Sequence, residues 1–232
     1  MSRNATRFWW IVLVAVVIGL SIWGLVHNAR LFLVTVLNGL TLASLYFIVA
    51  SGFTLVFGLM RNVNLAHGSL YLLGGYIGYV VAEKTGLWLL ALAAGFLGAA
   101  VVGLLIQLVL LRHMQGQDLR QTMVTIGLSI VIADILLWIF TGEVHQMEPP
   151  SWLKGPLRGI PIINAYSQYR MSLLVLGIVI GVALWLFLNR TRVGMMIRAG
   201  VDDRAMLAAA GINVNLVFAV TFAIGAGLAG LG

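Results

Sequence analysis

The sequence of 232 residues contains no cysteine, which excludes disulfides, thiolate metal sites and a cysteine nucleophile. Charge is also scarce, because charged residues make up 9% of the chain, against about 25% in a soluble domain. Hydrophobic residues reach 61%, more than a single soluble core can bury. A bilayer solvates the outer face of every apolar helix, and the strand-length alternation of a membrane β-barrel is missing. The composition therefore predicts an all-α, polytopic helical membrane protein.

Apolar segments separated by charges and turn residues follow one another along the chain. They cover residues 8–26, 31–58, 66–82, 87–111, 121–141, 171–189 and 216–232. At about 20 residues per crossing, plus connections, a chain of this length holds roughly seven membrane helices. The first segment is longer than the about 7–15 residues of a signal-peptide core, so we expect it to remain as a membrane helix. The sequence predicts about seven membrane segments in a single domain, 1–232.

The basic residues indicate how these segments are oriented. If the N-terminus is cytoplasmic, the inner loops carry Arg3, Arg7, Arg61, Arg112, Arg120, Arg190, Arg192, Arg198 and Arg204. The outer loops then carry only Arg30, Lys84, Lys154, Arg158 and Arg170. This excess on one side is the positive-inside pattern, so the net charge of +7 favours a lipid bilayer and no nucleic acid as partner. We expect a multi-pass protein of the cell inner (plasma) membrane with a cytoplasmic N-terminus.

The segment 31–58 carries the candidate solute path. As one straight helix it is about 42 Å long, which exceeds a hydrocarbon core of about 30 Å, so it should tilt steeply or break. The candidate break points are Gly39, Ser51, Gly52 and Gly58. At 100° per residue, Thr41, Ser44 and Ser51 share a narrow stripe beside Asn38. These polar residues either line a cavity near a break at Gly52 or bond back to helix backbone, and the sequence favours neither.

Two connections differ from the apolar segments. Residues 141–169 contain all four prolines, which predicts an ordered outer cap with a short helix or turns and no crossing. Residues 191–211 form a polar cytoplasmic loop, in which Asp202 or Asp203 caps a short helix that stops at Gly211. On composition alone this loop lies on anionic lipid. The apolar pair Met206 and Leu207 argues for a protein partner, because so short a helix is unstable unless it docks.

Several glycine patterns predict close packing of helices. GAGLAG at 225–230 has the spacing of a dinucleotide loop, but no strand precedes it, so helix packing is the better interpretation. The pairs Gly74/Gly78 and Gly177/Gly181 have the spacing that lets membrane helices approach closely. The Lys-Thr pair at 84–85 lacks the second glycine of a phosphate-binding loop. We expect no cofactor and no ATP site in this chain.

Asp134 is the one carboxylate well inside an apolar segment, and such residues are usually functional. It suggests a secondary transporter coupled through Asp134, although no second intramembrane charge completes a proton relay, and a structural role competes. An intramembrane enzyme with a serine and a histidine is a weaker alternative, because His67, His113 and His145 lie in different segments. Their spacing also predicts no metal site.

Two stretches resemble a known family. Residues 38–76 (NGLTLASLYFIVASGFTLVFGLMRNVNLAHGSLYLLGGY) and 191–232 (TRVGMMIRAGVDDRAMLAAAGINVNLVFAVTFAIGAGLAGLG) resemble permease subunits of branched-chain amino-acid ATP-binding-cassette importers. Most of the match lies in Asn-x-Ala-His-Gly, with Asn64, His67 and Gly68, and in Gly-x-x-x-Arg-Ala at 194–199. Because members of that family continue beyond the position of Gly232, the chain resembles a subunit truncated at its C-terminus.

The resemblance implies a function and a set of partners. It implies import of a small polar solute by alternating access, with ATP hydrolysis in a separate subunit and no enzyme activity in this chain. The first expectation for the solute is a branched-chain amino acid, and urea, amides and aromatic acids stay open because their importers use similar permeases. It implies cytoplasmic ATP-binding subunits, a second permease subunit and a periplasmic or extracellular solute-binding protein. The loop 191–211 matches the family's coupling helix, and the residues assigned to ATPase coupling are Gly194, Arg198, Ala199, Asp202, Asp203, Met206, Leu207 and Gly211.

Overall fold

The computed structural model describes residues 3–60, 64–114, 116–157 and 166–232. Its helices are α1 (Arg3–Met60), α2 (His67–Thr85), α3 (Trp88–Val109), α4 (Asp118–Phe140), α5 (Gln168–Arg190), α6 (Arg192–Asp202), α7 (Arg204–Ala209) and α8 (Val214–Leu231), with 3-10 turns η1 (Leu111–Met114) and η2 (Ser151–Leu153). Within these ranges, β pairing is limited to one isolated bridge between Pro156 and Ser167. The helical prediction is confirmed.

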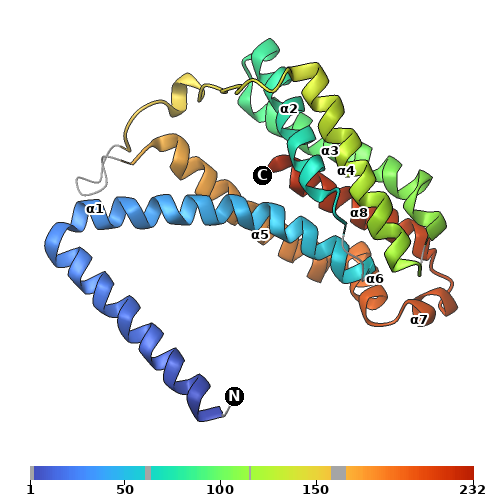
Figure 1. Ribbon diagram of the computed structural model, residues 1–232, viewed down its shortest axis with the longest axis horizontal. Coiled ribbons are helices and arrows are strands. Elements are labelled where there is room, and N and C mark those ends of the chain that lie inside the picture. Colours follow the sequence, from blue (N-terminus) through green and yellow to red (C-terminus); the bar gives the residue numbers. More distant parts are fainter. Residues whose placement is uncertain (1–2, 61–63, 115, 158–165) are drawn as a thin grey trace.

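Helix α1 runs for 58 residues and turns at Asn28, which has non-helical angles of φ −158° and ψ 85°. The Asn28 Oδ1 accepts a hydrogen bond from the Leu31 amide at 3.0 Å, so this side chain caps the second half of the helix. The first half extends away from the other helices, whereas the second half runs alongside α5 (Figure 1). The turn separates the segments 8–26 and 31–58 as the sequence predicts.

The predicted break near Gly52 is wrong. Beyond Asn28, α1 continues as a regular helix to Met60, through Gly39, Ser51 and Gly52. A Cβ at Gly52 would lie 2.5 Å from the Gly225 carbonyl oxygen, so the glycine is required for close approach of α1 to α8. The absence of a side chain at Gly52 therefore allows α1 and α8 to pack closely, and the helix continues without a break.

Helix α8 lies at the centre of the bundle, against α1, α2 and α3 (Figure 1). A Cβ at Gly74 of α2 would lie 2.1 Å from the Gly230 Cα, and one at Gly95 of α3 would lie 2.9 Å from the Gly74 carbonyl oxygen. Three backbones thus meet where no side chain separates them. Around this contact an apolar core is formed by Val56, Leu70, Ile106, Leu111, Phe222, Ala226 and Ala229. The packing role predicted for GAGLAG is confirmed.

The second glycine pair also packs helices. A Cβ at Gly177 of α5 would lie 2.6 Å from the Ser44 Cβ of α1, and one at Gly181 would lie 3.1 Å from the Phe47 ring. The α5 face is therefore in close contact with the second half of α1, which explains why the two helices run side by side.

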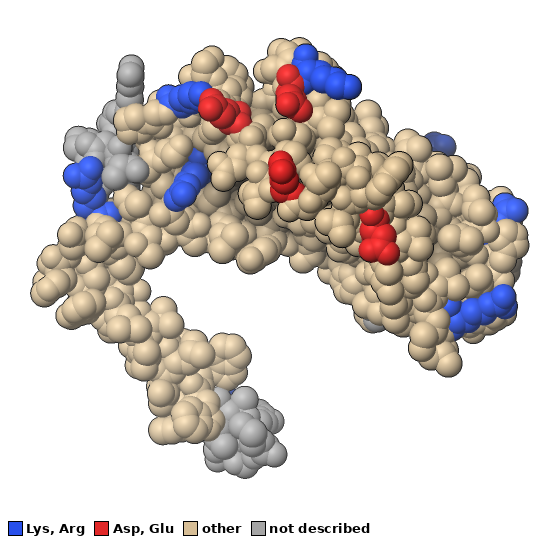
Figure 2. Space-filling view, turned by 45° about the horizontal axis from the view of Figure 1, so that its top comes forward, with Lys and Arg blue, Asp and Glu red and all other residues tan. Residues whose placement is uncertain are grey.

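Among the described helices, α1 (over Arg7–Gly58), α3, α4, α5 and α8 are long and apolar enough to cross a membrane. Helix α2, with 19 residues, matches the predicted segment 66–82 but falls outside this group. Large apolar side chains are exposed along these helices, and Figure 2 shows that few charges interrupt the visible surface. The chain is a multi-pass helical membrane protein.

Candidate functional site

The polar stripe on α1 faces α5 and Tyr166, which lies two residues before α5 begins. The Thr41 hydroxyl donates to the Leu37 carbonyl at 2.9 Å and pairs with the Tyr166 hydroxyl. Tyr166 is 1% exposed. Sequence analysis missed Tyr166, because nothing in the local pattern indicates that it reaches a residue so far back in the chain.

The other members of the stripe are bonded in the same region. The Ser44 and Ser51 hydroxyls donate to the carbonyls of Thr41 and Ile48, at 2.7 and 2.8 Å. The Asn38 Oδ1 accepts from the Arg170 guanidinium at 2.6 Å. Of the five residues predicted for the solute path, Ser51 borders a cavity, while Ser44 and Gly52 lie in helix contacts.

That cavity lies at the α6 end of α1. It has a volume of about 430 Å³ and is formed by one face of α1, the end of α5 and one face of α6. Its lining includes Ser51, Thr54, Gly58, Leu188 and Arg198. We call it the α6-end cavity. Its walls are almost entirely apolar, with the Ser51 and Thr54 side chains and the Arg198 head as the polar exceptions.

A larger cavity of about 590 Å³ lies at the opposite end of the bundle, which we call the α2–α3 end. Helices α2, α3 and α5, the end of α8 and residues 142–147 surround it. The His145 ring lies 4.7 Å from the Tyr79 ring, and Tyr76 stacks on Phe140 at 4.1 Å. Apolar walls with a few polar groups at one side are typical of a small-molecule site. Sequence analysis missed this cavity. The one available signal was that Tyr71, Tyr76 and Tyr79 lie beside the glycines of α2.

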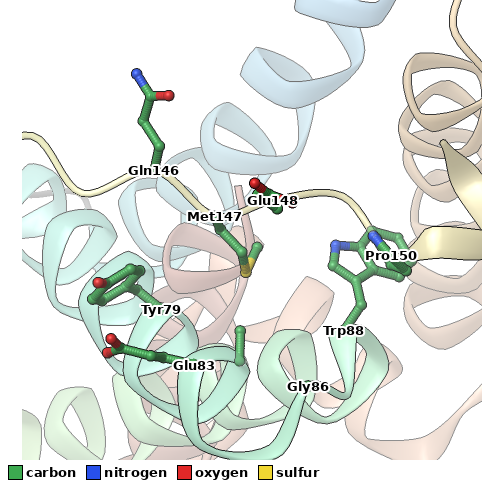
Figure 3. A pocket seen from close by; sticks show the side chains of 9 residues that line it. Tyr79, Glu83, Gly86, Trp88, Gln146, Met147, Glu148 and Pro150 are labelled. Atoms are coloured by element: carbon green, nitrogen blue, oxygen red, sulfur yellow. The ribbon is translucent and has the colours of Figure 1, made fainter. Parts of the chain in front are cut away.

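A pocket of about 290 Å³ adjoins this end (Figure 3). The Trp88 indole Nε1 is buried and has no hydrogen-bond partner among the described residues. Figure 3 shows this nitrogen on the side of the ring that faces Met147. On the rim, the Lys154 ammonium donates to Glu148 at 2.5 Å, and this hydrogen bond lowers the pKa of the Glu148 carboxyl below its ordinary value. The connection is an ordered cap here, with the turn η2, as predicted; Pro161 lies outside the described residues.

The start of α2 is fixed by the Asn-x-Ala-His-Gly turn. The Asn64 Oδ1 accepts from the Ala66 amide at 3.1 Å, and the His67 Nε2 lies 3.0 Å from the Val49 carbonyl oxygen. A Cβ added at Gly68 would meet no neighbouring segment within 4 Å. The turn therefore ties α2 to α1, which gives His67 a structural role.

The segment 191–211 consists of two helices, so the prediction of a loop with a single short helix is wrong in part. The Thr191 hydroxyl caps α6 by accepting from the Gly194 amide at 3.0 Å. A Cβ at Gly194 would lie 2.3 Å from the Phe187 carbonyl oxygen, so this position requires glycine. Arg198 donates to the Asn189 Oδ1 at 2.8 Å, and Ala199 is exposed on the same helix.

The second helix, α7, begins and ends as the sequence predicts. The Asp203 carboxylate accepts from the amides of Ala205 and Met206, at 2.8 and 3.0 Å, so Asp203 is the cap and Asp202 ends α6. Gly211 stops the helix with a left-handed φ of +77°.

An apolar cluster anchors both short helices to the bundle. It consists of Leu55, Ile197, Leu207, Val217 and Phe218. The Met206 side chain, by contrast, is 73% exposed. The α6–α7 pair is thus attached to α1 and α8 on one side and presents an apolar residue on the other.

The intramembrane carboxylate Asp134 and the histidines do not form a common site in the described part of the chain. Asp134 is exposed on α4, and no hydrogen bond or ion pair involves it among the described residues. Within the described ranges, no three histidine or acidic residues lie close enough to hold a metal ion.

The structure is that of a multi-pass helical membrane protein, with cavities at two ends of a glycine-packed bundle and a pair of short helices attached, and the comparison with known families gives its class, a transport permease. The sequence model of the family described as "Branched-chain amino acid transport system / permease component" matches residues 35–232. The chain belongs to this family.

Individual relatives agree with this assignment. The chain is 31% identical over 217 residues to the high-affinity branched-chain amino acid transport system permease protein LivH of Escherichia coli (strain K12) and 30% identical over 216 residues to LivH of Salmonella typhimurium. It is 28% identical over 211 residues to BraD of Pseudomonas aeruginosa, the permease protein of a system with the same description. Each match covers 85% of this chain and 68% of the relative. No solved structure matches significantly.

Proposed function

We propose that this chain is the membrane-spanning permease subunit of an ATP-driven importer for branched-chain amino acids. The family match over residues 35–232 carries the proposal, and the α6–α7 pair gives it a physical mechanism. The test is uptake of radioactive leucine into proteoliposomes that hold the chain with its co-purified ATP-binding subunits, with the solute-binding protein outside. Uptake should require internal ATP. Uptake driven by a proton gradient without ATP would instead support a secondary carrier coupled through Asp134.

We propose seven crossings with the N-terminus in the cytoplasm. The turn at Asn28 divides α1 into two crossings, and α2, α3, α4, α5 and α8 supply one each. This arrangement places α6–α7, with Arg192, Arg198 and Arg204, on the cytoplasmic side, in accordance with the positive-inside pattern.

This topology predicts opposite labelling of two cysteines in the cysteine-free chain. Ala199→Cys on α6 should resist an impermeant maleimide in intact cells and react once the membrane is permeabilised. Val144→Cys, in the exposed connection after α4, should react in intact cells and serves as the control. Labelling of Ala199→Cys from outside would contradict the topology.

The proposed complex contains two cytoplasmic ATP-binding subunits, a second permease subunit and a solute-binding protein. The ATP-binding subunits would contact α6–α7 through Met206 and its neighbours, and the solute-binding protein would deliver solute at the α2–α3 end. Alternating access then requires that a displacement of α6–α7 also displaces α1 and α8. The apolar contacts of Leu207 on α7 with Leu55 on α1 and Phe218 on α8 support such coupled movement.

We propose that the solute moves along α1, at the stripe of Asn38, Thr41, Ser44, Ser51 and Gly52, between the cavities at the two ends of the bundle. In the present conformation all three hydroxyls of the stripe donate to backbone carbonyls, so a conformational change must separate α1 from α5 to expose them. Ser51 is the member that already borders the α6-end cavity.

Ser51→Leu should therefore reduce leucine uptake at least several-fold, because the added side chain enters the α6-end cavity. Ala43→Leu is the control, since Ala43 is exposed on the same helix and does not line this cavity. Ser44→Leu is a poorer test, because the larger side chain would also separate α1 from Gly177. Uptake is measured per amount of complex recovered, and normal uptake by Ser51→Leu would exclude this residue from the path.

A further inference from the structure

One row of residues on α3 changes character in the last turn of the helix. Its members are buried and lie four residues apart, namely Ala91, Gly95, Ala99, Gly103 and Gln107. The first four are small and let helices meet closely, since a Cβ at Gly103 would lie 2.4 Å from the Ala226 Cβ of α8. The fifth is a glutamine that is only 1% exposed. The row of close helix contacts therefore ends in a buried amide.

The Gln107 amide is buried without a protein partner. Neither its Oε1 nor its Nε2 has a hydrogen bond within the described part of the chain. Such burial is strongly unfavourable, because the hydrogen bonds that the amide makes in bulk water are not replaced. Gln121 of α4 shows the usual arrangement, since it is 4% exposed and its Nε2 donates to the Met114 carbonyl at 2.8 Å. Gln107 therefore needs a ligand other than the described residues.

The end of α3 that carries Gln107 lies beside the turn that precedes α2. Helices α2 and α3 are joined by two residues and run antiparallel, and Gly74 of α2 meets Gly95 of α3. The apolar core described above contains residues of both helices beyond this contact, so the helices stay together toward this end. Continued by about three turns, the same register brings Gln107 level with the turn that holds Asn64.

Two residues at the start of α2 each contribute a further polar atom that is buried and unbonded within the described ranges. The Asn64 Oδ1 accepts from the Ala66 amide, which leaves its Nδ2 as a donor without an acceptor. The His67 Nε2 is bonded to the Val49 carbonyl oxygen and therefore carries the proton, which leaves Nδ1 as an acceptor without a donor. With Gln107, this end of the bundle thus contains unbonded donors and unbonded acceptors.

Water is the ligand that fits these groups. It both donates and accepts, as this mixed set requires, and an internal water makes about two to four hydrogen bonds to buried polar groups. An ion does not fit, because the buried polar residues of the described chain are amide, hydroxyl and imidazole side chains, with no carboxylate, lysine or arginine among them. Lipid and further protein segments cannot reach Gln107, because the described residues already cover 99% of it.

We propose that internal water is bound between the Gln107 amide and the Asn64 Nδ2, in a site enclosed by α2, α3 and α8. Gln107 lies one turn beyond Gly103, and a Cβ at Gly103 would lie 3.4 Å from the Phe222 ring of α8, so this ring should border the water. The bundle thus has close helix contacts along the small residues of α3 and a hydrated layer at the last turn. The site is independent of the proposed transport function, and no transport measurement enters its test.

X-ray radiolysis of the unaltered protein, in its complex in lipid nanodiscs, tests for this water. Radiation converts bound water into hydroxyl radicals, which oxidise adjacent side chains, and mass spectrometry measures the oxidation of each residue relative to the denatured chain. Ile106 is next to Gln107 in the chain and is 6% exposed, whereas the control Leu228, on α8 beside Gly52, is 5% exposed. We expect Ile106 or Phe222, or both, to be oxidised well above Leu228. If neither exceeds Leu228, this end of the core is dry and the proposal is overturned.

Two glutamine variants show whether Gln107 holds the water. Gln107→Leu removes the amide and leaves an apolar space, which stays dry, so the oxidation of Ile106 and Phe222 should fall to the level of Leu228. Gln121→Leu is the matched control, because Gln121 is similarly buried but bonded to the protein, and the oxidation should persist in it.

Oxidation that persists in Gln107→Leu, or that is lost in both variants, would contradict a water site at Gln107. Should Gln107→Leu fail to assemble, the comparison with Leu228 in the unaltered protein still decides whether water is present.

Discussion

Gly74→Ala should destabilise the bundle, whereas Gly75→Ala, one residue further along α2, should leave it intact. Both substitutions replace a glycine in the interior of α2 by alanine, which favours the helical conformation by about 1 kcal/mol. At Gly74 the new methyl group would lie 2.1 Å from the Gly230 Cα, and at Gly75 it would meet nothing within 4 Å. The change in helix propensity is therefore the same in the two variants, and any difference in their stability reports the packing of α2 against α8.

The atoms that oppose the new methyl group at Gly74 belong to backbone, so no side chain can rotate to make room. Helices α2 and α8 must separate, with a cost of about 1–3 kcal/mol, as for other overpacked sites. Thermal unfolding of each purified variant in detergent measures the difference. Equal unfolding temperatures for the two variants would show that the contact of Gly74, Gly95 and Gly230 does not hold the bundle together.

Reciprocal substitution locates the effect within the bundle. Gly230→Ala should resemble Gly74→Ala, because its methyl group would lie 2.4 Å from the Ala99 Cβ and 2.7 Å from the Gly95 carbonyl oxygen. Gly39→Ala, on α1, meets nothing within 4 Å and serves as a control outside α2. The same glycine-to-alanine substitution should thus lower the stability of the protein where two backbones meet and leave it unchanged on an open helix face.

This difference explains where sequence reasoning failed. Hydropathy and caps are local properties, so the apolar segments, the cap at Asp203 and the stop at Gly211 could be predicted. The function of Gly52 could not, because a glycine that admits a neighbouring backbone looks the same in the sequence as one that breaks a helix. The contact of Thr41 with Tyr166 depends on residues 125 positions apart and has no local signal.

Helix α6 was missed for a different reason. Its apolar residues Val193, Ile197 and Gly200 lie on one face at helical spacing, and Thr191 precedes them as a cap. This pattern is typical of an amphipathic helix, but the arginines Arg192 and Arg198 beside these apolar residues suggested a solvated loop. The distribution of charge describes the outer face of α6, whereas the spacing of the apolar residues shows that the other face packs on the bundle.

Met206→Asp should abolish most of the solute-stimulated ATPase activity of the assembled transporter. Met206 is exposed on α7 while its neighbour Leu207 is buried, so the side chain is free to enter an apolar groove of a partner. A carboxylate in such a groove loses its hydration without gaining a partner charge, and the docked state becomes strongly unfavourable. Met206→Leu keeps the apolar character and should retain the stimulation.

The stop at Gly211 tests whether the orientation of α7 matters as well as its surface. Its φ of +77° is strained for a β-branched residue, so Gly211→Val should change the path from α7 into α8 and lower the stimulation. Gly211→Asn, which tolerates this region, should retain more activity than valine. The measurement is ATPase activity with and without solute-loaded binding protein, per amount of complex. Full stimulation in both Met206→Asp and Gly211→Val would mean that α7 does not connect ATP hydrolysis to the membrane helices.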